Sequence, residues 1–329
     1  MGSGRTLRAV TPRISVVIPT RGRRPERLRA AVDALAAQEG LGAGGLEVIV
    51  AADPGAALPP ARAASPETAA IAVRTVHADA PASAAAKRNL AWPLAEAPLV
   101  AFTDDDCVPA PGWAAALLAV HERRPTAFVQ GRTLPDPAEA EDLWGLAVTQ
   151  WIERDSPWQE TCNIAYPREL LERLGGFDEG YGELGGEDTD LGQRALQSGA
   201  AKVYEPRALV WHAVEQRRFR AALREAFRTR DQPQVLARFP HLRRELVLNL
   251  FYRAEHARLA LALAGAATRR PAIAVLAATP YVELHLRHYR LSPLSVMRAS
   301  THLPVRAAVD AIETAVVFSR GARRGVVAL

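Results

Sequence analysis

The sequence predicts an α/β fold: a sheet built from βαβ units, followed by a helical C-terminal region. Short runs of apolar, largely β-branched residues alternate with amphipathic helical segments in the N-terminal part of the chain. Acidic or basic clusters follow directly after several of these runs. Beyond Val214 the composition changes to stretches rich in Ala, Leu and Arg with helical spacing. These three observations together predict the fold class.

The first expected strand, residues 14–18 (ISVVI), is apolar at most positions, which indicates a strand buried on both faces of a parallel sheet. Ligands of such sheets bind at the carboxyl ends of the strands. The other expected strands are residues 46–50, 73–77, 99–103 and 208–211, and the expected helices are residues 25–38, 83–95, 112–120, 219–228, 242–263 and 305–318.

Length and composition limit the function classes. The 329 residues, 49% of them apolar, suffice for a large core and about two domains. A net charge of +5 suits a phosphate-bearing substrate or an anionic membrane face and is too small to predict nucleic-acid binding. Cys107 and Cys162 lack the spacing of a disulfide framework or a zinc site. Without an N-terminal apolar stretch or a spanning run, we expect a cytoplasmic protein, with the inner face of the cell membrane as a second location.

Three carboxylates, Asp104, Asp105 and Asp106, follow the apolar run at residues 99–103. If the chain stays extended, Asp104 and Asp106 project to one side and can share Mg²⁺ or Mn²⁺ through oxygen ligands. The alternatives are a solvated acidic turn or a cap for the expected helix at residues 112–120. His212 follows the last expected strand and is a metal ligand only together with the aspartates; otherwise it is a structural histidine.

A second acidic cluster, residues 185–190, precedes a helix that ends near Gly199. The glycine-rich residues 175–186 before it can form a lid that carries a carboxylate to the substrate. The alternative is that these carboxylates only cap the helix and offset its dipole, Asp190 above all.

These motifs, in this order, resemble the family-two glycosyltransferases of the GT-A fold. The resemblance covers residues 14–212 and implies a nucleotide-diphospho-sugar transferase fold with a Rossmann-like mixed sheet. It divides the chain into a tail (1–13), a GT-A domain (14–215) and a helical region (216–329). The matching pieces are VVIPTRGR at 16–23, EVIVAADPG at 47–55, AAAKRNLA at 84–91, FTDDDCVPAPGW at 102–113, NIAYPRELLERLGGFDE at 163–179, GGEDTDLGQRALQSGA at 185–200 and LVWH at 209–212.

The resemblance implies a nucleotide-sugar donor, with a UDP-sugar favoured, bound together with Mn²⁺ or Mg²⁺. Asp106 would hold the metal and His212 would complete its coordination. Ala52 and Pro54 stand where the family usually has polar neighbours of the base-binding aspartate, which leaves the base identity open. The implied donor-binding residues are Pro19, Thr20 and Arg21 in the nucleotide pocket, Asp53 on the base, Lys87 and Arg88 on uracil or the diphosphate, and Asp104 on the ribose or sugar, with Asp105 beside it.

For catalysis the resemblance implies Asp188 as the base and Glu187 as an orienting residue. The base removes the acceptor proton while the acceptor oxygen attacks the anomeric carbon opposite the diphosphate, so that the configuration inverts. The acceptor would be a glycan, a lipid-linked hydroxyl or a small-molecule hydroxyl, with Trp113, Asn163 and residues 177–181 on its side. Residues 216–220 do not match the Gln-x-x-Arg-Trp motif of the processive members, which predicts a non-processive enzyme.

Several alternatives stay open. The C-terminal apolar stretches, interrupted by arginines such as Arg269 and Arg270, indicate either peripheral membrane contact or a helical subdomain packed on the core or on another subunit. A nucleotidyltransferase would need a Gly-rich basic loop after the first strand, where PTRGRRPER contains one Gly. A catalytically silent sugar-nucleotide-binding or scaffold protein would be favoured by loss of either acidic cluster, and both clusters are intact.

Overall fold

The computed structural model describes residues 11–41, 45–56, 71–143, 145–181, 185–227, 232–286, 293–326 and 328. The chain forms two compact units. The first consists of Met1–Leu134, Gln150–Glu179 and Asp190–His212, and the second of Pro135–Thr149, Gly180–Thr189 and Ala213–Leu329.

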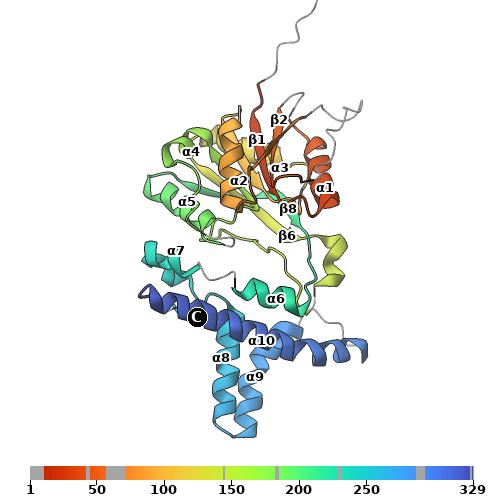
Figure 1. Ribbon diagram of the computed structural model, residues 1–329, viewed down its shortest axis with the longest axis vertical. Helices are drawn as coiled ribbons and strands as arrows, with labels where there is room; N and C mark the ends of the chain where they lie inside the picture. Colours follow the sequence, from red (N-terminus) through yellow and green to blue (C-terminus); the bar gives the residue numbers. More distant parts are fainter. Residues whose placement is uncertain are drawn as a thin grey trace, which may run out of the picture. The chain divides into compact units, whose positions relative to one another are not determined.

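The first unit contains a mixed sheet, as expected from the motifs (Figure 1). Over the described residues its strand order is β3-β2-β1-β4-β7-β6-β8-β5. The neighbours β1–β2, β2–β3 and β1–β4 are parallel, whereas β4–β7, β6–β7 and β5–β8 are antiparallel. The strands are β1 (Ile14–Thr20), β2 (Leu46–Ala52), β3 (Ala72–His77), β4 (Leu99–Thr103), β5 (Cys107–Pro109), β6 (Phe128–Pro135), β7 (Asn163–Pro167) and β8 (Lys202–His212).

Helices cover both faces of this sheet, because the central strands are apolar on both sides. Val16 belongs to a core cluster with α1 and α3, while Val17, which points to the opposite face, belongs to a cluster with α2, α4 and α5. These helices are α1 (Pro25–Ala36), α2 (Ala84–Ala91, continued by a 3₁₀ turn at Trp92–Leu94), α3 (Trp113–Arg123), α4 (Arg168–Leu174) and α5 (Glu187–Gln197).

The parallel register brings polar residues to one edge of the sheet. Thr20, the last residue of β1, pairs with Ala52 at the end of β2. Asp53 follows Ala52, and Asp104 follows the last residue of β4. The carboxyl ends of β1, β2 and β4 therefore present the side chains predicted to bind the donor.

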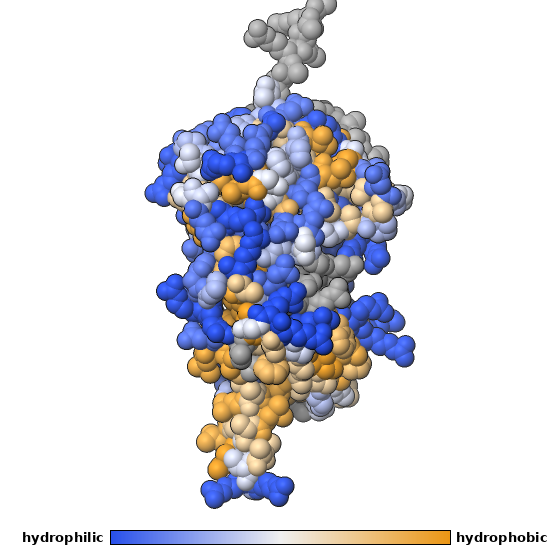
Figure 2. Space-filling model, turned by 60° about the vertical axis from the view of Figure 1, so that its left-hand side comes forward, coloured by the Kyte–Doolittle hydropathy of each residue, from blue (hydrophilic) through white to orange (hydrophobic). Residues whose placement is uncertain are grey.

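The second unit is mainly helical. The helices α8 and α9 run side by side as a hairpin (Figure 1), and the visible surface of this hairpin is largely apolar (Figure 2). No helix among the described residues is long and apolar enough to cross a membrane. The elements are 3₁₀ turns at Pro137–Asp142 and Pro240–Glu245, and helices α6 (Phe219–Ala226), α7 (Gln232–Arg238), α8 (Ala254–Ala267), α9 (Pro271–Leu286) and α10 (Pro293–Arg323).

One expected C-terminal helix is wrong. Residues 242–263 were predicted as a single helix, but Leu248 and Asn249 adopt left-handed φ angles of 56° and 58°, which a right-handed helix cannot contain. A 3₁₀ turn therefore precedes them and α8 starts only at Ala254. The other two predicted helices lie within or beside α10 and α6, and Arg228 lies outside the described residues.

A buried ionic cluster links α8 and α10. His256, Asp310 and Glu313 have possible ligand atoms within 4.8 Å of one another. However, Arg306 lies 2.8 Å from Asp310 and Arg253 lies 3.0 Å from Glu313. The two guanidinium groups balance both carboxylates, so we interpret the cluster as an ion-pair network of the fold and not as a metal site.

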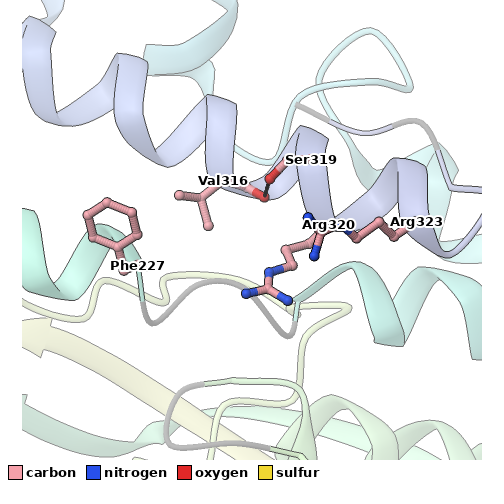
Figure 3. Close-up of a pocket in the computed structure, with 5 residues that line it drawn as sticks. All are labelled: Phe227, Val316, Ser319, Arg320 and Arg323. Atoms are coloured by element: carbon pink, nitrogen blue, oxygen red, sulfur yellow. Dashed lines mark hydrogen bonds between the residues drawn. The ribbon is translucent and has the colours of Figure 1, made fainter.

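A small pocket lies between α10 and Phe227, the residue that follows α6 (Figure 3). Its volume is about 210 Å³ and its other lining residues are Val316, Ser319, Arg320 and Arg323. Ligand pockets usually enclose about 300–1,000 Å³. None of the predicted site residues lines this pocket, and we assign it no ligand.

Candidate functional site

The three aspartates after β4 occupy a tight turn. The backbone N–H of Cys107 donates to the carbonyl of Asp104 at 3.2 Å, and the chain returns as β5. The expectation of an extended chain is therefore wrong here. Because the chain turns, the neighbouring carboxylates Asp105 and Asp106 share one guanidinium group, that of Arg24.

Each of the three carboxylates pairs with an arginine. Arg88 Nη2 lies 2.9 Å from Asp104 Oδ1. A single guanidinium, that of Arg24, lies 3.2 Å from Asp105 Oδ1 and 2.5 Å from Asp106 Oδ2. Two arginines thus offset the crowded negative charges. Arg24 lies in the loop before α1, and Arg88 lies in α2.

Asp105 is the most buried of the three and faces β1. The hydroxyl of Thr20 donates to Asp105 Oδ2 at 2.6 Å. Burial raises the pKa of Asp105, and the charges of Asp106 and Asp104 add to this; Arg24 and the Thr20 hydrogen bond oppose it. Asp105 therefore fastens the turn to the end of β1.

Asp106 and His212 converge from neighbouring strands. The antiparallel pairing of β5 with β8 sets Cys107 opposite His212, and His212 Nε2 lies 3.7 Å from Asp106 Oδ1. Cys107 has its sulfur in the same group of possible ligands. Burial raises the pKa of the Cys107 thiol well above its usual value. Hard cations such as Mg²⁺ and Mn²⁺ prefer oxygen ligands to a soft thiolate. Asp106 and His212 therefore offer one carboxylate oxygen and one imidazole nitrogen as candidate ligands of a divalent cation.

A buried ion pair stands at the end of β2. Lys87 Nζ lies 2.7 Å from Asp53 Oδ1, and the Ala82 N–H donates to the same oxygen at 3.2 Å. Burial would raise the pKa of Asp53, but Lys87, the Ala82 N–H and nearby Arg21 outweigh it, so the pKa is lowered. Asp53 therefore carries a stable negative charge beside the predicted base position.

The remaining predicted donor residues lie at the same edge. Pro19 is buried in β1 opposite Ala51 of β2, and Arg21 directly follows the strand. Lys87 and Arg88 are both buried, in the middle of α2, with the Arg88 guanidinium 5.5 Å from the ring centroid of Phe177. The structure thus brings the donor-side residues together around the ends of β1, β2 and β4.

The second acidic cluster forms the first turn of α5 and does not merely precede it. Asp188 is partly exposed, and its Oδ1 accepts a hydrogen bond from the Thr189 N–H at 2.7 Å. Glu187 is buried. Residues 182–184 of the predicted lid lie outside the described residues, so the lid stays a prediction.

Asp190 has a different environment. It is fully buried, and Arg194 Nε lies 2.6 Å from its Oδ2. The same guanidinium donates to the carbonyls of Leu174 at 2.8 Å and Gly176 at 2.7 Å. Asp190 thereby orients the arginine that joins α5 to the end of α4, which is a role in folding.

Four of the residues expected on the acceptor side are buried. Trp113 and Asn163 are fully buried, and Trp113 Nε1 donates to Asn163 Oδ1 at 2.8 Å. Phe177 and Tyr181 are also buried. The aromatic side chains pack in the core, where large rings gain most from burial, while Asp178, Glu179 and Gly180 of the same loop are partly or fully exposed. The acceptor side stays a prediction.

Arg24 was missed by the sequence analysis. It is the third arginine in the segment TRGRR after β1, together with Arg21 and Arg23. The only available signal was the proximity of a basic run to one strand end and an acidic run to another. The sequence could not predict which of the three arginines would pair with Asp106, because all three carry the same charge.

Two protein families match the first part of the chain. Residues 15–175 match the family described as Glycosyl transferase family 2, and residues 147–215 match the N-terminal domain of galactosyltransferase. The chain carries a family-two glycosyltransferase domain. The protein is thus a glycosyltransferase, and both matches lie in the region that supplies the strand-end residues. No curated protein matches the sequence.

Solved structures agree with this glycosyltransferase on the fold. The mannosyltransferase PcManGT from Pyrobaculum calidifontis is 19% identical with a TM-score of 0.54, covering 94% of this chain and 87% of that one. Residues 1–349 of TarS from S. aureus are 13% identical with a TM-score of 0.50, covering 95% of this chain and 92% of that one. At such identities the likeness establishes the fold alone.

We predict that Asp190→Ala lowers the stability of the glycosyltransferase by about 3 kcal/mol or more, because it leaves Arg194 without its carboxylate beside the core. Urea denaturation measures the loss. Glu172→Ala is the matched control, since it breaks an exposed Arg168–Glu172 pair of the same i,i+4 spacing and is expected to cost about 0.3–0.5 kcal/mol. Equal small losses would contradict the folding role of Asp190.

Proposed function

We propose that this glycosyltransferase is inverting, divalent-metal dependent and non-processive, and that it moves a sugar from a nucleotide diphosphate to an acceptor hydroxyl. The observation that carries the proposal is the convergence of Asp104, Asp106, Arg88 and His212 at the end of β4. Carboxylate, imidazole and guanidinium groups at one strand edge suit a cation together with a diphosphate. We retain residues 14–215 as the donor-binding domain.

The donor side follows from the polar edge of the sheet. Asp53 would accept hydrogen bonds from the base, held in position by Lys87. Arg88 would share its guanidinium between Asp104 and the diphosphate, and Asp104 would accept from a ribose or sugar hydroxyl. We favour a UDP-sugar because of the resemblance of the Asp53 and Lys87 positions to family members. PcManGT was solved with GDP-Man and Mn²⁺ and TarS with UDP-GlcNAc, so a GDP-sugar is the competing donor.

Asp106 and His212 would hold the divalent cation. When bound, the cation supplies positive charge against the negative charge that grows on the leaving diphosphate. Arg88, which is buried and therefore poorly screened, adds to this stabilisation. Arg24 balances Asp105 and Asp106 in the free protein and keeps the turn closed until the donor arrives.

Asp188 would act as the base. It is partly exposed at the start of α5, so that an acceptor hydroxyl can reach its carboxylate, and the Thr189 N–H donates to its Oδ1. Attack then proceeds opposite the diphosphate and inverts the anomeric carbon. Glu187 would orient the acceptor or the donor sugar. The proposed acceptor is the hydroxyl of a glycan, of a lipid-linked molecule or of a small molecule.

For Asp106→Ala we predict that the ratio of UDP affinities with Mn²⁺ and with EDTA falls to about one, because the carboxylate that holds the cation is lost. Isothermal titration calorimetry measures both affinities. Asp104→Asn is the matched control: it weakens binding in both conditions and retains the ratio. An unchanged ratio in Asp106→Ala would assign the metal to other residues.

For Asp188→Asn we predict that sugar transfer falls by roughly 10²–10⁴-fold, the usual contribution of a general base, while donor affinity stays within a factor of about two. Product formation is followed with the donor that binds best, and affinity by calorimetry. Glu172→Gln also replaces a carboxylate by an amide, at an exposed position of α4, and should leave sugar transfer and donor affinity unaltered. Strong residual transfer in Asp188→Asn would remove it as the base.

A further inference from the structure

The hairpin of α8 and α9 exposes large apolar side chains. Its outer part, residues 259–280, is called the distal hairpin below. Arg269 and Arg270 are its only charged residues, and they stand at the bend between the helices. Val275 is 70% exposed and Leu276 75%, far more than packed residues of these types. Leu261, Leu263 and Ile273 are exposed as well.

These apolar side chains surround the hairpin. The backbones approach closely where Gly265 faces Ala277, because a Cβ on Gly265 would lie 2.4 Å from the Ala277 Cβ. A helix turns by about 100° per residue, so that a residue two positions away points almost to the opposite side. Leu263 and Val275 are each two positions from this contact. They therefore lie on the two outer faces of the hairpin.

This distribution of apolar side chains bears on whether a protein or a lipid phase covers the distal hairpin. A protein partner covers one face and leaves the opposite face in water. A lipid phase covers a hairpin from several sides at once. Apolar residues on opposing outer faces therefore favour lipid, and Figure 2 shows an apolar surface that ends in a hydrophilic tip.

The charges at the bend indicate the kind of lipid. Arg269 and Arg270 are exposed, and the distal hairpin contains no acidic residue to neutralise them. The Arg270 N–H donates to the hydroxyl of Thr268, which itself donates to the Gly265 carbonyl, so the bend is held by local hydrogen bonds. Two guanidinium groups on a fixed bend suit the phosphates of anionic headgroups.

We infer that the distal hairpin enters the headgroup and acyl boundary of an anionic bilayer and attaches the glycosyltransferase to it. Interfacial helices sink by about 5–10 Å, close to a helix diameter of about 10–12 Å, so most of the apolar surface is covered. The arginine stems extend along the apolar surface and their charged ends reach the phosphates. The inference does not depend on the donor, the metal or the catalytic base.

Sedimentation with vesicles tests the inference on the full chain. We expect the protein to pellet at low salt with vesicles of phosphatidylglycerol and phosphatidylcholine. Leu263→Glu with Val275→Glu should lower the bound fraction at least fivefold, because both outer faces then carry charge. Leu94→Glu with Leu196→Glu, two exposed positions of the first unit, is the matched control and should bind like the unaltered protein.

The arginines provide a second arm. We expect the unaltered protein to prefer anionic vesicles to pure phosphatidylcholine vesicles. Arg269→Gln with Arg270→Gln should remove this preference, so that the fraction bound to anionic vesicles falls by about tenfold. Circular dichroism melting checks that every variant is folded.

Absence of pelleting, or pelleting that survives Leu263→Glu with Val275→Glu, would overturn the inference. So would a concentration-dependent dimer that this pair dissociates while no vesicle binding occurs, which would assign the distal hairpin to a second copy of the chain. Because vesicle binding is measured without donor or metal, failure of the proposed transferase mechanism would leave this result unaffected.

Discussion

The crowding of three negative charges at the end of β4 is the constraint on which the candidate site depends. Successive carboxylates in a tight turn repel one another, and two arginines offset this repulsion. Arg88 reaches Asp104 from α2, and Arg24 reaches Asp105 and Asp106 from the loop before α1. The compensation therefore ties segments together that are far apart in sequence. In the proposed function, a cation and a diphosphate replace these ion pairs.

The sheet could be predicted from the sequence because its signal is local. The run at residues 14–18 is apolar throughout most of its length, and β1 forms there and extends to Thr20. The position of Asp104 after β4 followed from the same signal. The turn itself could not be predicted, since it depends on one backbone hydrogen bond between Cys107 and Asp104. The break before α8 likewise depends on the φ angles of Leu248 and Asn249, which no hydrophobic pattern records.

Residue type alone did not separate chemistry from packing. Asp188 and Asp190 belong to one acidic cluster, yet one is partly exposed and the other is buried against Arg194. Trp113 and Asn163 have the functional groups of a sugar site but bond to each other inside the core. Burial is a property of the whole fold, and only the structure reveals it. Arg24 illustrates the reverse case, a surface-type residue drawn to the site by charge.

The central claim, that the strand-end cluster binds a nucleotide diphosphate together with a divalent cation, is tested most directly by thermal shift. UDP, GDP and dTDP are each added with Mn²⁺, with Mg²⁺ or with EDTA. We expect one nucleotide, UDP, to raise the melting temperature by about 5 °C or more at 100 times its dissociation constant, and only with metal. Equal shifts in EDTA, or no shift with any nucleotide and metal, would contradict the claim.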